Sequence, residues 1–305
     1  MRPTVTVVGS HPVDYDPGLK DRLLERLRRR SAYAPAIREA VRDQLEAGVE
    51  LISDGQVRGD MIEIFASYIP GLTAEGEPAV VGRVEPPRSS PVALDYREAV
   101  RAAGERAEVK AILTGPVTLA HSLRVETDLY PSNDHPSLLK DLARALAVEA
   151  RRLREAGAEV LQVDEPILST GAVRVGKVAR YVNRVLRAFR GGTRVLHVCG
   201  RVVDVYGELE GKIRADVLDH EFAGHPENLE AVAAGSRPIG VGVVRSDEER
   251  VERVREAVEL LRRAREELGE RIEFVDPDCG LRRLPRRVAR EKLRVVREAR
   301  DRVFS

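Results

Sequence analysis

A histidine and a cysteine lie two residues apart in the stretch RVLHVCGR, at residues 194–201. The apolar residues around them indicate a buried strand, in which residues i and i+2 point to the same side. His197 and Cys199 are therefore expected on one face, just before a glycine. An imidazole and a thiolate are ligand types that zinc prefers. A structural role stays open as well, because a free cysteine often behaves as a small buried apolar side chain.

Two further candidate ligands lie at the ends of other apolar runs. Glu221 lies in DVLDHEF at residues 216–222, and Cys279 lies in IEFVDPDCG at residues 272–280. Thiolates, an imidazole and a carboxylate together form a zinc donor set, but their wide spacing is not that of a zinc finger. Such dispersed ligands need a prefolded scaffold. Taken alone, Cys279 also fits a structural side chain and Glu221 an ion-pair partner.

Polar residues end several of the other apolar runs. Gly9 and Ser10 end the first run, and Gln56 follows the second. Asp164 and Glu165 end the fourth run, and a buried carboxylate needs a partner or a function. We therefore predict a functional site at these ends.

Eight short β-rich runs alternate with long amphipathic stretches that carry apolar residues at three- and four-residue spacing. This alternation predicts parallel βαβ units, and eight of them predict a closed (β/α)8 TIM barrel of the α/β class. An open doubly wound sheet is the alternative. In a barrel of this kind the site forms at the C-terminal ends of the strands. The runs lie at residues 4–10, 50–55, 110–116, 159–166, 194–200, 216–222, 238–244 and 272–280.

Two segments between these elements are predicted as loop insertions in a single domain that covers residues 1–305. Residues 70–95 are rich in Pro, Gly and Ser, which indicates a hairpin or a long loop over one barrel end. Residues 125–136 indicate a second long loop.

The composition favours a cytoplasmic protein with a real core. The chain has 305 residues, 43% of them hydrophobic, and a net charge of +1. This balance indicates neither a nucleic-acid partner nor a membrane surface. No apolar run reaches the roughly 18–20 residues that span a bilayer, and the N-terminus does not resemble a signal peptide. Many Arg and Glu residues, with few amides, are typical of a thermophile.

Six motifs in the chain resemble the catalytic C-terminal half of cobalamin-independent methionine synthase, in particular the short archaeal core-type enzymes. The motifs follow the order of that family and extend over nearly the whole chain. They are VVGSHP (7–12), DGQVRGDMIEIF (54–65), LTGPVTLA (113–120), QVDEP (162–166), LHVCG (196–200) and VDPDCGL (275–281).

This resemblance implies that a zinc ion is held by His197, Cys199, Glu221 and Cys279. Homocysteine would bind beside the metal, and Asp164 and Glu221 would be the catalytic residues. Second carboxylates orient metal-bound histidines in many sites, so Asp219 or Asp278 is expected to orient His197.

The resemblance also implies how homocysteine is held. Ser10 and the backbone around Val8 and Gly9 would bind its carboxylate, and Asp164 would bind its amino group. Gln56 lies where the large enzymes carry a glutamate, the second partner of the ammonium group.

The chain departs from the large enzymes where they bind a methylated folate. It contains no Trp, whereas they carry one just after the GPVT motif. It also lacks their proton-donating histidine after the seventh strand, where it reads VVRSDEER at residues 243–250, with Asp247 near that place. A folate leaving group needs a proton and a corrinoid does not. The predicted methyl donor is therefore a methylated corrinoid, on a protein or free, and not methyltetrahydrofolate.

Three other interpretations stay open from the sequence. The acceptor thiol could be coenzyme M or another small thiol, because Gln56 is uncharged and coenzyme M has no ammonium group. A non-catalytic partner of a corrinoid protein, with a structural zinc, is the second. A metal-free decarboxylase-like barrel is the third, and the four-ligand set argues against it.

Overall fold

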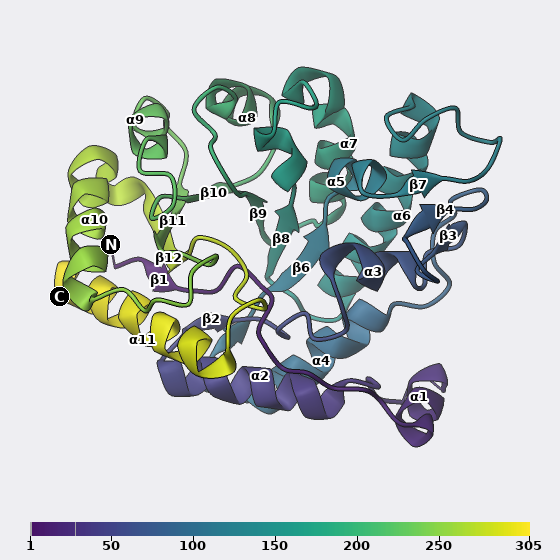
Figure 1. The fold of residues 1–305 in the computed structure, drawn as a ribbon, viewed down its shortest axis with the longest axis horizontal. Coiled ribbons are helices and arrows are strands. Elements are labelled where there is room, and N and C mark those ends of the chain that lie inside the picture. The colour runs from purple at the N-terminus through teal and green to yellow at the C-terminus, as the bar shows by residue number, and fades with distance from the viewer. Residues whose placement is uncertain (1, 28) are drawn as a thin grey trace.

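Seven parallel strands form one curved sheet in the order β1-β12-β11-β10-β9-β8-β6 in the computed structural model, which describes residues 2–27 and 29–305 (Figure 1). Each strand pairs with the strand of the preceding or following unit, as βαβ units require. The strands are β1 (Thr4–Val5), β6 (Ala111–Thr114), β8 (Val160–Asp164), β9 (Thr193–Val198), β10 (Val217–Glu221), β11 (Ile239–Val244) and β12 (Ile272–Pro277).

Two short strands close this sheet into a ring. β2 (Leu51–Ile52) pairs in parallel with β5 (Glu108–Val109). Thr6, just after β1, forms a parallel bridge with Leu51. β5 continues into β6 past Lys110, whose backbone N–H donates to the carbonyl of Ile52. Counting β5 and β6 as one strand, eight parallel strands surround the axis. The predicted (β/α)8 barrel is confirmed, and the open sheet is wrong.

Eight helices follow the eight strands in turn and surround the ring (Figure 1). Their apolar stripes pack on the strands. In α6, for example, Leu138, Leu142 and Leu146 are four residues apart and lie on one buried face. These helices are α2 (Ala34–Ala47), α4 (Pro91–Ala103), α6 (Pro136–Glu155), α7 (Val175–Ala188), α8 (Tyr206–Lys212), α9 (Asn228–Ala233), α10 (Val254–Leu268) and α11 (Arg286–Val303).

Shorter elements lie in the connections. β3 (Leu72–Thr73) and β4 (Ala79–Val80) form an antiparallel pair, and β7 (Arg124–Val125) adds a third strand to it. The hairpin predicted within residues 70–95 is thus confirmed, and residues 126–135 form the second predicted loop. The other short helices are α1 (Leu19–Arg26), α3 (Met61–Ala66), α5 (Pro116–His121), η1 (Pro166–Ser169) and η2 (Gly269–Arg271). Among the described residues, no helix combines the length and apolar character needed to cross a membrane.

The barrel interior is layered along its axis. Near the N-terminal ends of the strands, an apolar cluster closes the bottom; it contains Leu51, Val160, Val195, Val217 and Phe274. Two residues further along each strand, the alternation of the pleat brings polar side chains to the same inner face. These buried residues are Ser53, Gln162, His197, Asp219 and Asp276. The polar layer thus supports the mouth, where the strands end.

Candidate metal and substrate site at the barrel mouth

Three of the four predicted metal ligands meet at the barrel mouth. Ligand atoms of His197, Cys199 and Cys279 all lie within 4.8 Å of one another. The two sulfur atoms are 3.5 Å apart and are not joined in a disulfide. His197 and Cys199 share a face because they are two residues apart at the end of β9. Cys279 reaches them across the mouth, because β12 is separated from β9 by two strands.

The imidazole of His197 is held in the orientation of a metal ligand. Its Nδ1 lies 3.0 Å from Oδ2 of Asp219, the residue that faces His197 in the register of β9 and β10. Its Nε2 is buried and has no hydrogen-bond partner among the described residues. Histidines that bind metals commonly donate their second nitrogen to a carboxylate in this way. Of the two carboxylates expected to orient His197, Asp219 does so, whereas Asp278 accepts backbone N–H groups of residues 222–224.

The charges at this cluster favour a bound cation. The hydrogen bond with Cys199 lowers the pKa of the Cys279 thiol well below its ordinary value. Burial opposes a charged imidazole, yet Cys199 and Asp219 raise the pKa of His197 well above its usual range. Two cysteine sulfurs, one of them in a thiol with a lowered pKa, and a buried imidazole nitrogen without a hydrogen-bond partner match the donor chemistry of a divalent metal such as zinc.

The carboxylate of Glu221 lies beside this cluster and not within it. Glu221 ends β10, and its Oε2 is 3.7 Å from Nε2 of His225. Burial and the charge of Cys279 raise the pKa of Glu221, while His197 lowers it. The carboxylate therefore shares the electrostatic field of the cluster but is not among the three ligand atoms that lie together.

A cavity of about 340 Å³ opens over these three candidate ligands. Four of the five predicted substrate residues line it, namely Val8, Ser10, Gln56 and Asp164. Gly9 lies behind them, where a Cβ atom would come within 2.7 Å of Oε1 of Gln56. Nine further lining residues were not predicted as site residues, and only the motifs DGQVRGDM, QVDEP and VDPDCGL and the turns after the last two strands hinted at them. They are Gly59, Asp60, Met61, Pro166, Ser246, Asp247, Gly280, Arg282 and Arg283.

The neighbouring carboxylates Asp164 and Glu165 have different surroundings. Asp164 lines the cavity, and burial raises its pKa to about 6. Glu165 points the other way and accepts the backbone N–H groups of Val117 and Thr118 at the start of α5. Its role in this structure is to cap that helix, so of the two carboxylates only Asp164 lines the candidate site.

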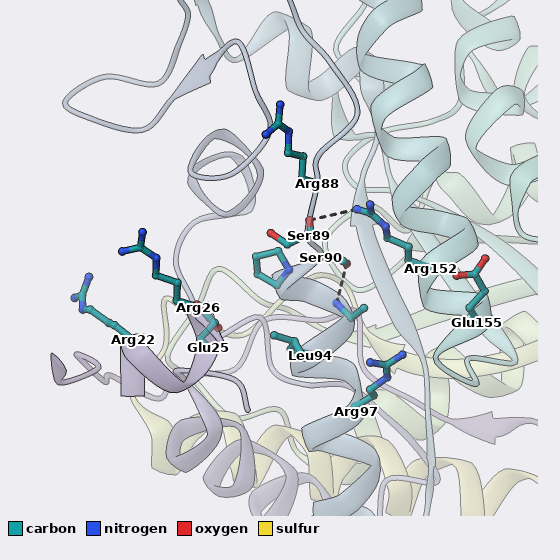
Figure 2. Close-up of a pocket in the computed structure, with 12 residues that line it drawn as sticks. Arg22, Glu25, Arg26, Arg88, Ser89, Ser90, Leu94, Arg97, Arg152 and Glu155 are labelled. Atoms are coloured by element: carbon teal, nitrogen blue, oxygen red, sulfur yellow. Dashed lines mark hydrogen bonds between the residues drawn. The ribbon is translucent and has the colours of Figure 1, made fainter. Parts of the chain in front are cut away.

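Larger clefts lie on the outside of the barrel, away from the predicted site. One of about 510 Å³ lies between α1, α4 and α6, and arginines from all three helices and from the preceding loop surround Ser89 and Ser90 (Figure 2). Arg152 donates there to the carbonyl of Ser89. Another, of about 920 Å³, lies along α6 and α7. Neither contains a predicted site residue, so the convergence of donor atoms and not cavity size marks the candidate site.

Comparison with known proteins agrees with this geometry. The sequence model of the family described as "Cobalamin-independent synthase, Catalytic domain" matches residues 3–302. A methionine synthase of Methanothermobacter thermautotrophicus is 41% identical over 300 residues, which cover 95% of this chain and 96% of that protein. A methionine synthase of Methanocaldococcus jannaschii is 38% identical over 307 residues, with coverage of 96% and 97%.

Solved structures show the same fold. A B12-independent methionine synthase from a Shewanella species, in complex with selenomethionine, superposes with a TM-score of 0.83 at 22% identity. That superposition covers 99% of this chain and 97% of the other. A methyltransferase from Methanosarcina mazei superposes with a TM-score of 0.68 at 18% identity, with coverage of 100% and 95%. The chain belongs to the family of cobalamin-independent synthase catalytic domains.

Proposed function

We propose that this chain transfers a methyl group to the thiol of homocysteine and so forms methionine, with a zinc ion at the barrel mouth. Membership of the family makes the chain a methyltransferase. The observation that carries the proposal is the unpartnered Nε2 of His197, which lies beside two cysteine sulfurs in a cavity that Asp164 and Ser10 also line. A metal site and a site for an amino acid therefore share one cavity.

The residues present fit a zinc ion. His197 Nε2 and the sulfurs of Cys199 and Cys279 would hold it, and Asp219 fixes the imidazole from behind. Glu221 is the proposed fourth ligand, because its carboxylate interacts electrostatically with both Cys279 and His197. Zinc bound by such ligands lowers the pKa of a thiol that coordinates it and keeps the sulfur as a thiolate at neutral pH.

The residues of the cavity would bind homocysteine by its two charged groups. Asp164 accepts the ammonium group, and the backbone of Val8 and Gly9 with the hydroxyl of Ser10 receives the carboxylate. Gln56 lies next to Gly9 and offers an amide oxygen to the same ammonium. Held at both charged groups, the substrate directs its sulfur toward the metal ligands. The thiolate sulfur then attacks the methyl carbon of the donor. The bond between that carbon and the donor breaks, the electron pair of this bond leaves with the donor, and a thioether forms.

A methylated corrinoid, on a protein or free, is the proposed donor in place of methyltetrahydrofolate. Ser246 and Asp247 line the mouth in the stretch that lacks the histidine of the large enzymes. The hydrogen bonds from Arg245 lower the pKa of Asp247, which stays a carboxylate and has no proton to give. A donor whose leaving group needs no proton is therefore consistent with the residues at this mouth.

Metal removal tests the proposal directly. Protein purified without added metal is expected to contain about one zinc per chain, because the cluster offers one closely spaced set of ligands. It should methylate homocysteine with methylcobalamin as the probe donor, and a chelator should abolish this turnover until zinc returns. A competition assay with coenzyme M as the second thiol shows which of the two thiols is the preferred methyl acceptor. Full turnover by zinc-free protein would contradict the proposal.

A substitution at Gly280 tests the proposed carboxylate site. A Cβ atom at Gly280 would overlap Oγ of Ser10, so Gly280→Ala must displace this hydroxyl. We expect the KM for homocysteine to rise about tenfold, the loss of one hydrogen bond to a charged group, with zinc content unchanged. Gly207→Ala in α8 is the matched control, because a Cβ there meets nothing within 4 Å. An unchanged KM in Gly280→Ala, measured by steady-state kinetics, would remove Ser10 from the site.

A further inference from the structure

A single buried amide connects the two parts of the proposed amino-acid site. Gln162 lies two residues before Asp164 on β8 and is completely buried. Its Nε2 donates to Oδ1 of Asp164 at 2.7 Å and also to the backbone carbonyl of Val8 at 2.7 Å. Asp164 belongs to the proposed ammonium site, and Val8 begins the proposed carboxylate site. This one side chain therefore bridges the two parts by hydrogen bonds.

A buried lysine fixes which way the amide of Gln162 faces. The Nζ of Lys110 donates to Oε1 of Gln162 at 2.5 Å. An ammonium group can only donate hydrogen bonds, so the amide oxygen must face it and the NH₂ group must face away. In the opposite orientation, the NH₂ group would meet the ammonium, and the amide oxygen would meet two acceptors.

The position of Lys110 suits this task. Its side chain is buried at the point where β5 passes into β6. Burial lowers the pKa of Lys110 below its ordinary value, and the nearby carboxylates of Asp219, Asp276 and Asp164 oppose this shift. A buried charge needs such partners, and these three carboxylates supply them. Lys110 is not among the residues that line the cavity and is not one of the three candidate metal ligands.

We propose that Gln162, oriented by Lys110, is a positioning residue that holds Asp164 and Val8, in the segment after β1, at the spacing of an α-amino acid. The pair would thereby set the preference of the site for thiols that carry an α-ammonium group over thiols that lack it. This inference rests on the proposed function, in which Asp164 binds the ammonium of homocysteine.

Gln162→Glu separates positioning from packing. Glutamate has nearly the same shape and still accepts from Lys110, but it cannot donate to Asp164 or Val8. We expect the KM for homocysteine to rise about tenfold, the loss of a hydrogen bond to a charged acceptor. The kcat at saturation should fall less. The KM for 4-mercaptobutyrate, which lacks the ammonium group but keeps the carboxylate that binds beside Val8, should rise less than the KM for homocysteine. The affinity for methionine, measured by calorimetry, should fall by a factor similar to the rise in the KM for homocysteine.

The double variant Lys110→Met, Gln162→Met is the control for folding. Replacing both partners leaves neither an unpaired ammonium nor an unpaired amide, but the carboxylates of Asp219, Asp276 and Asp164 lose a nearby cation. The thermal unfolding of the double variant should therefore stay cooperative, with a lower midpoint. It should show the same loss of selectivity between the two thiols. Equal shifts of KM for both thiols in Gln162→Glu would show a merely structural role and overturn the inference.

A separate variant distinguishes this failure from failure of the proposed function. If Asp164→Asn weakens homocysteine but Gln162→Glu does not, the inference is wrong and the proposed function stands. If Asp164→Asn changes nothing, the ammonium site itself is wrong, and the inference falls with it.

Discussion

Cys279→Ser is expected to abolish zinc binding and to lower methyl transfer to homocysteine more than about 100-fold. Loss of a residue that merely orients a metal ligand costs about 10–100-fold in metal affinity, and loss of the ligand itself should exceed this. A serine hydroxyl stays protonated at neutral pH and does not replace a thiolate. Elemental analysis and a methyl-transfer assay measure the two effects.

The barrel should remain folded in this variant. Cys279 is half-buried and follows β12, and serine is close to it in size. Circular dichroism and thermal unfolding should therefore match those of the unmodified chain saturated with a chelator. Ser246→Ala is the matched control, because Ser246 lines the same cavity without belonging to the ligand cluster. Retained zinc and full turnover in Cys279→Ser would remove this cysteine from the site.

Asp164→Asn should weaken homocysteine binding about 10- to 100-fold and leave the zinc content unchanged. Hydrogen bonds to charged groups contribute about 1.5–3 kcal/mol, and here the carboxylate that faces the ammonium is buried, with little competing water. The side-chain oxygen of an asparagine can still accept the hydrogen bond from Gln162, so the side chain at position 164 keeps its orientation. The KM for homocysteine and calorimetry with methionine measure the loss.

Asp60→Asn is the control for this second change. Asp60 lines the same cavity and accepts the backbone N–H of Ile62 at the start of α3. Asparagine caps a helix about as well as aspartate, so only the charge at the mouth changes. If the two variants weaken homocysteine equally, a general negative charge at the mouth is responsible and the specific role of Asp164 is wrong.

The inner face of the strands could be predicted because side-chain direction along a strand is a local property. His197 and Cys199 are two residues apart, and the structure brings both to the mouth. Val217 and Asp219 likewise share the inner face, the first in the apolar floor and the second against His197. The alternation of apolar runs with amphipathic stretches predicted the barrel, because the spacing of apolar residues is also a local property.

Neighbouring residues at a strand end were harder to separate. Asp164 and Glu165 are both carboxylates after one apolar run, and the sequence favoured a function for each. One lines the cavity and the other caps α5, because adjacent side chains point to opposite faces. The polar interior residue Lys110 carried no sequence signal, since its partner Gln162 is 52 positions away along the chain.

By itself, the sequence determined the alternation of strands and helices, the residue types of the candidate ligands and the faces that they share, because periodicity and residue chemistry act over a few residues. Only the tertiary structure decided that Cys279 meets β9, that the Glu221 carboxylate lies beside the ligand cluster and that Gln162 connects Val8 with Asp164. These contacts join residues on different strands, and ring closure, tilt and register bring such residues together.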